Sequence, residues 1–89
     1  MLNKNDLIRT FLLTNEQNKG SNLVIDGNAL INYNTCIALK KDGLLYLNAN
    51  KYSQTTTRNQ NLLRRKASEY NIRVCECNQE QIYKIWFSI

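Results

Sequence analysis

Two Asp-Gly pairs, Asp26-Gly27 and Asp42-Gly43, separate short apolar runs in the first half of this 89-residue chain. Glycine tolerates the positive φ angles that a two-residue turn requires, so an Asp-Gly pair between apolar runs is a strong hairpin signal. The apolar runs lie at residues 23–25, 29–31, 36–39 and 44–47. The pattern predicts an antiparallel meander of three or four short strands between residues 22 and 48.

Apolar residues recur at helical spacing on both sides of this meander, over residues 5–16 and 55–70. In each segment they share one helix face. The stripes consist of Leu7, Ile8, Phe11 and Leu12 in the first segment and of Leu62, Leu63, Ala67 and Tyr70 in the second. Asn5 or Asp6 is a suitable cap for the first helix. Thr57–Gln60 fits a capping box at the start of the second.

The pattern of apolar residues does not determine the secondary structure of the whole C-terminal part. Residues 72–77 alternate well enough to be a further strand, with Ile72, Val74 and Glu76 on one face. Residues 79–89 fit either a short helix capped by Asn78 or a final strand. Taken together, the chain is expected to be one α+β domain over residues 1–89. Its small antiparallel sheet has three to five strands, an N-terminal helix precedes the meander and a basic helix follows it.

Composition excludes several kinds of chemistry. The chain has no histidine, so no imidazole can act as a base or bind zinc. Three cysteines are too few for a disulfide framework, and their odd number argues against one. Cys36 lies in an apolar run and has no histidine partner. We therefore expect no catalytic residues, no metal site and no cofactor. Apolar runs are too short for a membrane span, and polar residues interrupt the N-terminus, so we expect a cytoplasmic protein without a membrane partner.

Positive charge is concentrated in one segment. Between Lys51 and Arg73 there are six basic residues and one acid, whereas the rest of the chain has six of each, so this segment carries the net charge of +5. The basic residues are Lys51, Arg58, Arg64, Arg65, Lys66 and Arg73. A localised basic face is typical of a polyanion partner and fits an acidic protein surface equally well. A solvated helix face is the alternative.

Hydroxyl groups gather where the basic helix is expected to begin. Tyr52, Ser53, Thr55 and Thr56 precede Arg58 there. A helix N-terminus has free N–H groups and a partial positive charge, so it can hold a phosphate or a carboxylate. A hydrogen-bonded helix cap explains the same residues without a ligand. With the six basic residues, these four complete the set of candidate binding residues.

Two stretches resemble a known group of proteins. They are residues 30–38, which contain Tyr33-Asn34-Thr35-Cys36-Ile37-Ala38, and residues 51–60, which contain Tyr52-Ser53-Gln54-Thr55-Thr56. They resemble a group of short phage and plasmid accessory proteins marked by a Tyr-Asn-Thr-x-Ile-Ala strand and a Tyr-Ser-x-Thr-Thr-Ser-Lys-His-Gln box. This chain has Thr57, Arg58 and Asn59 where the box has Ser-Lys-His, so no role of that histidine is carried over. The resemblance implies a mobile-element accessory protein, a class that includes anti-CRISPR inhibitors of host defence and DNA-linked factors.

These observations lead to three functional hypotheses. In the first, a non-enzymatic phage or mobile-element protein inhibits a host-defence protein or nucleoprotein complex in the bacterial cell. In the second, the basic segment binds nucleic acid directly. In the third, the hydroxyl-rich helix start sequesters a phosphate-bearing signal molecule. Tyr83, Trp86 and Phe87 are either core residues or an edge for oligomer or partner contact, because aromatic residues commonly anchor interfaces.

Overall fold

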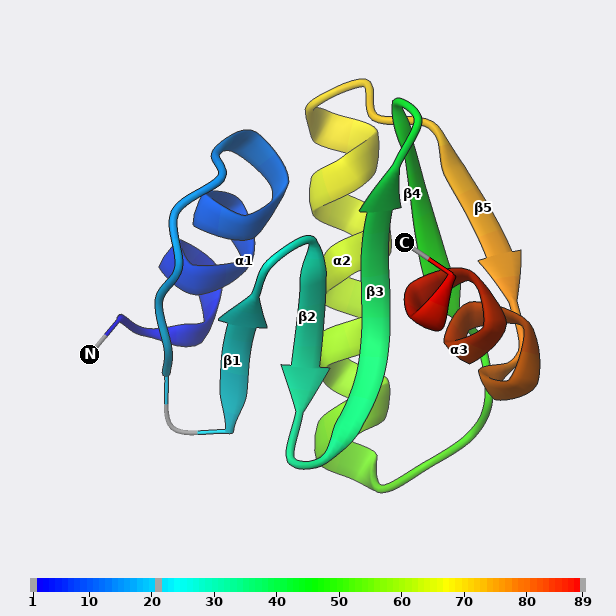
Figure 1. Cartoon of the computed structure of the whole chain (residues 1–89). Helices are drawn as coiled ribbons and strands as arrows, with labels where there is room; N and C mark the ends of the chain where they lie inside the picture. The colour runs from blue at the N-terminus through cyan, green and yellow to red at the C-terminus, as the bar shows by residue number, and fades with distance from the viewer. Residues whose placement is uncertain (1, 21, 89) are drawn as a thin grey trace.

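The structure is a computed structural model that describes residues 2–20 and 22–88 (Figure 1). Three helices and five strands follow one another along the chain. Their bounds are α1 (Lys4–Leu13), β1 (Leu23–Asp26), β2 (Ala29–Asn32), β3 (Thr35–Lys41), β4 (Leu44–Asn48), α2 (Gln54–Glu69), β5 (Val74–Cys77) and α3 (Gln79–Phe87). This confirms the predicted α+β class, with a helix before the meander and the basic helix after it. No helix in the described part of the chain is long and apolar enough to span a membrane.

The five strands form one sheet in the order of the sequence. Strands β1 to β4 pair antiparallel, as the meander predicts. Strand β5 pairs parallel to β4, so the sheet is mixed and not purely antiparallel as expected. The reason is the connection: α2 carries the chain back along the sheet, and β5 therefore enters in the same direction as β4. Figure 1 shows α2 behind the sheet, at β2 and β3.

Both Asp-Gly pairs lie at hairpin turns. Asp26 is still the last residue of β1 and pairs with Ala29, so the first turn consists of Gly27 and Asn28, with Gly27 at a φ of 60°. In the second turn, Asp42 and Gly43 are themselves the two loop residues, with φ angles of 54° and 76°. Positive φ at both positions is the geometry of a type I′ hairpin, whose twist matches that of its strands.

The caps of α1 and α2 differ from those expected, whereas α3 begins after Asn78, the cap expected for its helix alternative. Helix α1 begins after Asn3, whose side chain accepts a hydrogen bond from the Asp6 N–H at 2.9 Å, so Asn5 and Asp6 lie inside the helix. Helix α2 begins after Ser53, which accepts from the Thr56 N–H, and not at a capping box of Thr57–Gln60. The expected cap was wrong, although the expected helix over residues 55–70 agrees with α2 to one residue at each end. Any of several hydroxyls near residue 55 can cap a helix, and packing selects which one does.

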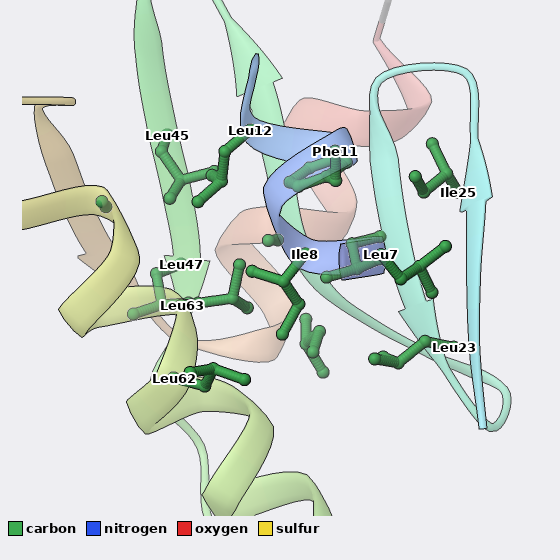
Figure 2. Packing of buried hydrophobic residues seen from close by; sticks show 14 residues of the cluster. Leu7, Ile8, Phe11, Leu12, Leu23, Ile25, Leu45, Leu47, Leu62 and Leu63 are labelled. Carbon is green, nitrogen blue, oxygen red and sulfur yellow. The ribbon is translucent and has the colours of Figure 1, made fainter. Parts of the chain in front are cut away.

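The sheet separates two layers of helix. Helices α1 and α2 cover one face, which we call the back face, and enclose the larger core, drawn in Figure 2. That core includes Leu7, Ile8, Phe11, Leu45, Leu47, Leu62 and Leu63. Helix α3 lies against β3 and β4 on the other face, the front face, where Ile82 is buried among Ala29, Cys36 and Leu39. The segment whose pattern fitted helix or strand is therefore a helix.

Candidate binding surfaces

The ten candidate binding residues do not form one surface, and four of them connect or cap elements of the fold: Tyr52, Ser53, Thr56 and Arg64. The Tyr52 hydroxyl accepts a hydrogen bond from Asn48 Nδ2 at 2.8 Å and donates one to Gln79 Oε1. It therefore connects β4 to the start of α3. Burial raises the pKa of Tyr52 above that of an ordinary tyrosine.

Ser53 and Thr56 form the cap of α2. Ser53 Oγ accepts from the Thr56 backbone N–H at 3.3 Å and lies 3.2 Å from Thr56 Oγ1. Thr56 is buried, whereas Thr55 is half-buried on the first turn. The hydroxyls that could have held an anion are thus engaged in capping, which is the structural explanation of this cluster.

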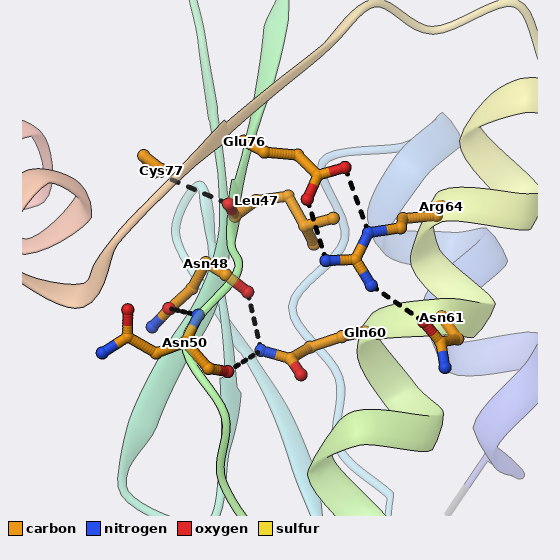
Figure 3. Close-up of polar contacts among 8 residues, drawn as sticks. All are labelled: Leu47, Asn48, Asn50, Gln60, Asn61, Arg64, Glu76 and Cys77. Atoms are coloured by element: carbon orange, nitrogen blue, oxygen red, sulfur yellow. Dashed lines mark hydrogen bonds and ion pairs between the residues drawn. The ribbon is translucent and has the colours of Figure 1, made fainter.

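Two of the basic residues are paired with acids. Arg64 forms a bidentate ion pair with Glu76 of β5: Nη2 donates to Oε1 at 2.9 Å and Nε donates to Oε2 at 3.2 Å (Figure 3). Its remaining nitrogen donates to Asn61 Oδ1 at 2.8 Å. Lys66 lies 3.9 Å from Glu69. Arg64 is therefore oriented toward β5 and joins α2 to the edge of the sheet.

Arg58 and Arg65 remain on the outside of α2, and we call this surface the outer face of α2. They are seven residues apart, so they project in nearly the same direction at a separation of about 10 Å along the helix axis. Both are exposed, and neither takes part in an ion pair within residues 2–20 and 22–88. Lys51 and Arg73 are also exposed, in the loops before α2 and before β5.

The sequence reasoning missed a set of buried amides. Gln60 Nε2 donates to the carbonyl oxygens of Asn48 at 2.6 Å and of Asn50 at 3.0 Å, which fixes the loop after β4 against α2 (Figure 3). Asn59 Nδ2 donates to Asn32 Oδ1 at 3.1 Å and joins α2 to β2. The helical spacing could have predicted their burial, because Asn59 and Gln60 precede Leu63 by four and three residues and so share its buried helix face.

A cluster of aromatic side chains lies on the front face, and we call Tyr83, Trp86 and Phe87 the aromatic cluster. Trp86 and Phe87 stack with ring centroids 5.1 Å apart, and Tyr83 meets both rings edge-on. The Tyr83 hydroxyl accepts from the Cys36 N–H at 3.2 Å, which fixes α3 on β3. Phe87 is 74% exposed, the largest exposure among the big apolar side chains described. An open hollow of about 860 Å³ borders Tyr83 and Phe87.

The cysteines offer no reactive thiol pair. Cys36, Cys75 and Cys77 are all free. Burial raises the pKa of Cys36 to about 12 and also raises that of Cys77, so both thiols stay protonated at neutral pH. Within the described residues no three His, Cys, Asp or Glu side chains come together as a metal site.

Comparison with known proteins adds no relative: the chain matches no family model, no curated protein and no solved structure.

Proposed function

We propose that this chain is a non-catalytic phage or mobile-element accessory protein that inhibits a host-defence complex by binding to it. Its resemblance to short phage and plasmid proteins supports the origin, as does a composition of fourteen Asn and seven Lys that AT-rich coding favours. Several acids have local roles, which supports binding over catalysis. Glu69, Glu76 and Glu80 are in ion pairs, and Asp26 and Asp42 lie at hairpin turns.

The observation that carries this proposal is the outer face of α2. Arg58 and Arg65 are exposed together on a helix that Arg64–Glu76 and the buried core hold rigidly to the sheet. Guanidinium groups bind carboxylates and phosphates through two parallel hydrogen bonds, so a rigid pair suits an acidic protein surface or a nucleoprotein. A mimic of DNA would need the opposite charge.

Direct nucleic-acid binding is the second candidate, because the same two arginines suit phosphates. Lys51 and Arg73 extend the positive charge beyond α2 on the segment that carries the net charge. The sponge for a phosphate-bearing signal molecule has the least support, since Ser53 and Thr56 already hydrogen-bond to each other in the cap.

One pair of double variants separates the first two functions. Arg58→Gln/Arg65→Gln removes the outer-face charges, and Lys4→Gln/Arg9→Gln removes two exposed charges from α1 as a matched control. Inhibition is measured as phage plating on bacteria that carry a defence system. Nucleic-acid binding is measured by fluorescence anisotropy with single-stranded and duplex DNA and RNA at low and moderate salt.

The inhibitor proposal expects defence to be blocked by the unaltered chain and by the α1 control but not by the outer-face variant, without nucleic-acid binding by the isolated protein. The second candidate expects tight binding at low salt whose logarithmic salt slope falls by about 2 in the outer-face variant, because two phosphate contacts are lost. Equal behaviour of the two double variants in both assays would contradict any role for the outer face of α2.

A further inference from the structure

The front face of the sheet is only half covered. Helix α3 lies over β3 and β4 and reaches Ala29 of β2, whereas among the described residues no helix lies in front of β1 or of the Ile31 end of β2 (Figure 1). Strand alternation places Leu23 and Ile25 in the back core, so Val24 points to the front, opposite Ile31 of β2. Val24 is 41% exposed and Ile31 is half-buried beside the Ile82 cluster. An apolar strip therefore runs alongside α3.

The aromatic cluster extends this apolar strip onto α3 itself. Trp86 borders a hollow of about 320 Å³ together with Leu39 and the turn between β1 and β2. Phe87 is exposed at the end of the helix. Ile31 and Trp86 pack against the same buried cluster around Ile82, which connects the strip to the aromatic cluster. Apolar residues gathered in this way mark an interaction site more often than scattered ones do.

The charges on the front face are balanced, unlike those of the back. Helix α3 carries Glu80 and Lys84, each 76% exposed and 3.3 Å apart, and strand alternation adds Asp26 and Lys41. These are two acids and two bases. The excess of positive charge belongs to residues 51–73, which include α2 on the back face. A neutral front face has no attraction for a polyanion, and it lets two copies approach without like-charge repulsion.

We propose that two copies of this chain associate through their front faces across a twofold axis. The α3 helices lie side by side and antiparallel, and the end of each α3 reaches the uncovered β1–β2 strip of the other copy. An antiparallel arrangement places Glu80 of one copy opposite Lys84 of the other, twice over, because a twofold interface repeats each contact. The outer faces of both α2 helices stay free on opposite sides of the dimer.

The dimensions of the molecule show how much of the front face a stable dimer must bury. The molecule measures 29 × 27 × 22 Å, and a standard interface buries about 800 Å² per partner, which takes up nearly one whole face. Helix α3, about 14 Å long for its nine residues, is too small by itself. Val24 of β1 and Phe87 of α3 must therefore both contribute.

Sedimentation equilibrium of the full chain, from low to several hundred micromolar, tests the dimer. We expect a concentration-dependent mass between 10.4 kDa and twice that value. Phe87→Ser and Val24→Ser each weaken dimerisation at least about tenfold, as for residues central to an interface. Leu13→Ser is the matched control, because Leu13 is 52% exposed at the end of α1 on the other side of the sheet and its loss leaves dimerisation unchanged.

A charge exchange tests the arrangement of the helices. Glu80→Lys alone and Lys84→Glu alone each weaken the dimer, since like charges then face each other across the axis. An equimolar mixture of the two variants restores dimerisation as a mixed dimer. A monomer at every concentration overturns the proposal, and so does a dimer that Phe87→Ser and Val24→Ser leave intact. A mixture that stays monomeric overturns the antiparallel pairing of α3.

Discussion

Replacing Gln60 with leucine tests whether the buried amides of α2 stabilise the fold. The side chain is 3% exposed and donates to the Asn48 and Asn50 carbonyls. Leucine has a similar size, so the substitution removes hydrogen bonds and leaves packing nearly unchanged. Asn50 is exposed and its carbonyl can turn to water, whereas Asn48 is fully buried and its carbonyl cannot.

The expected cost follows from this difference. Loss of the Asn50 bond costs about 0.5–1.5 kcal/mol, and an unsatisfied buried carbonyl at Asn48 costs about 1–3 kcal/mol. The sum, roughly 1.5–4.5 kcal/mol, is a large part of the total stability of a domain this size. Urea unfolding followed by far-UV circular dichroism measures it, with Gln54→Leu in the exposed first turn of α2 as the control. A decrease in the free energy of unfolding below about 0.5 kcal/mol for Gln60→Leu would show that the two hydrogen bonds of Gln60 do not stabilise the fold.

Four further outcomes can be measured on the same chain. A double-mutant cycle of Arg64→Ala and Glu76→Ala yields a coupling free energy of about 0.5–1 kcal/mol that falls with salt, because the pair is partly exposed; a coupling unaffected by salt would contradict this. Gly43→Ala costs about 1–2 kcal/mol in thermal unfolding because of its φ of 76°, and Gly43→Asn costs less. Ile82→Ala costs about 2–5 kcal/mol and changes the fluorescence of the single tryptophan, since Ile82 is the fully buried residue of α3. The pKa of the Cys36 thiol is 9.0 in the unfolded chain, and burial raises it to about 12 in the fold, so its contribution to stability is fully present below pH 9.0 and decreases above it. By about pH 10.5 the free energy of unfolding of the unaltered chain has fallen by about 2 kcal/mol more than that of Cys36→Ala. Parallel pH profiles of the two proteins would disprove this.

Much of the fold was predictable because its signals are local. The Asp-Gly pairs determine their turns through the backbone angles of Gly27 and Gly43, which are properties of one or two residues. The stripe of Leu7, Ile8 and Phe11 follows from helix geometry alone. These elements therefore form where the pattern places them, and the meander and both long helices are confirmed.

The caps of α1 and α2, the direction of β5 and the packing of α3 depended on the whole fold. Ser53 and Thr57 are equally good caps by sequence, and the pairing of Ser53 with buried Thr56 selects the first. The parallel direction of β5 depends on the path of α2 across the sheet. Residues 79–87 start with a local capping box of Asn78 and Gln81, but the packing of Ile82 on the front face of the sheet is a contact that no local pattern describes.

The candidate surfaces likewise depend partly on the sequence alone and partly on tertiary packing. The order of the residues alone shows that positive charge gathers between Lys51 and Arg73, since charge is a count of residues. Which cations stay exposed was decided by the tertiary structure, because β5 brings Glu76 to Arg64 from twelve residues away and leaves Arg58 and Arg65 outside. The charge of a residue follows from its side chain, but its interaction partner depends on packing between segments that are distant in the sequence.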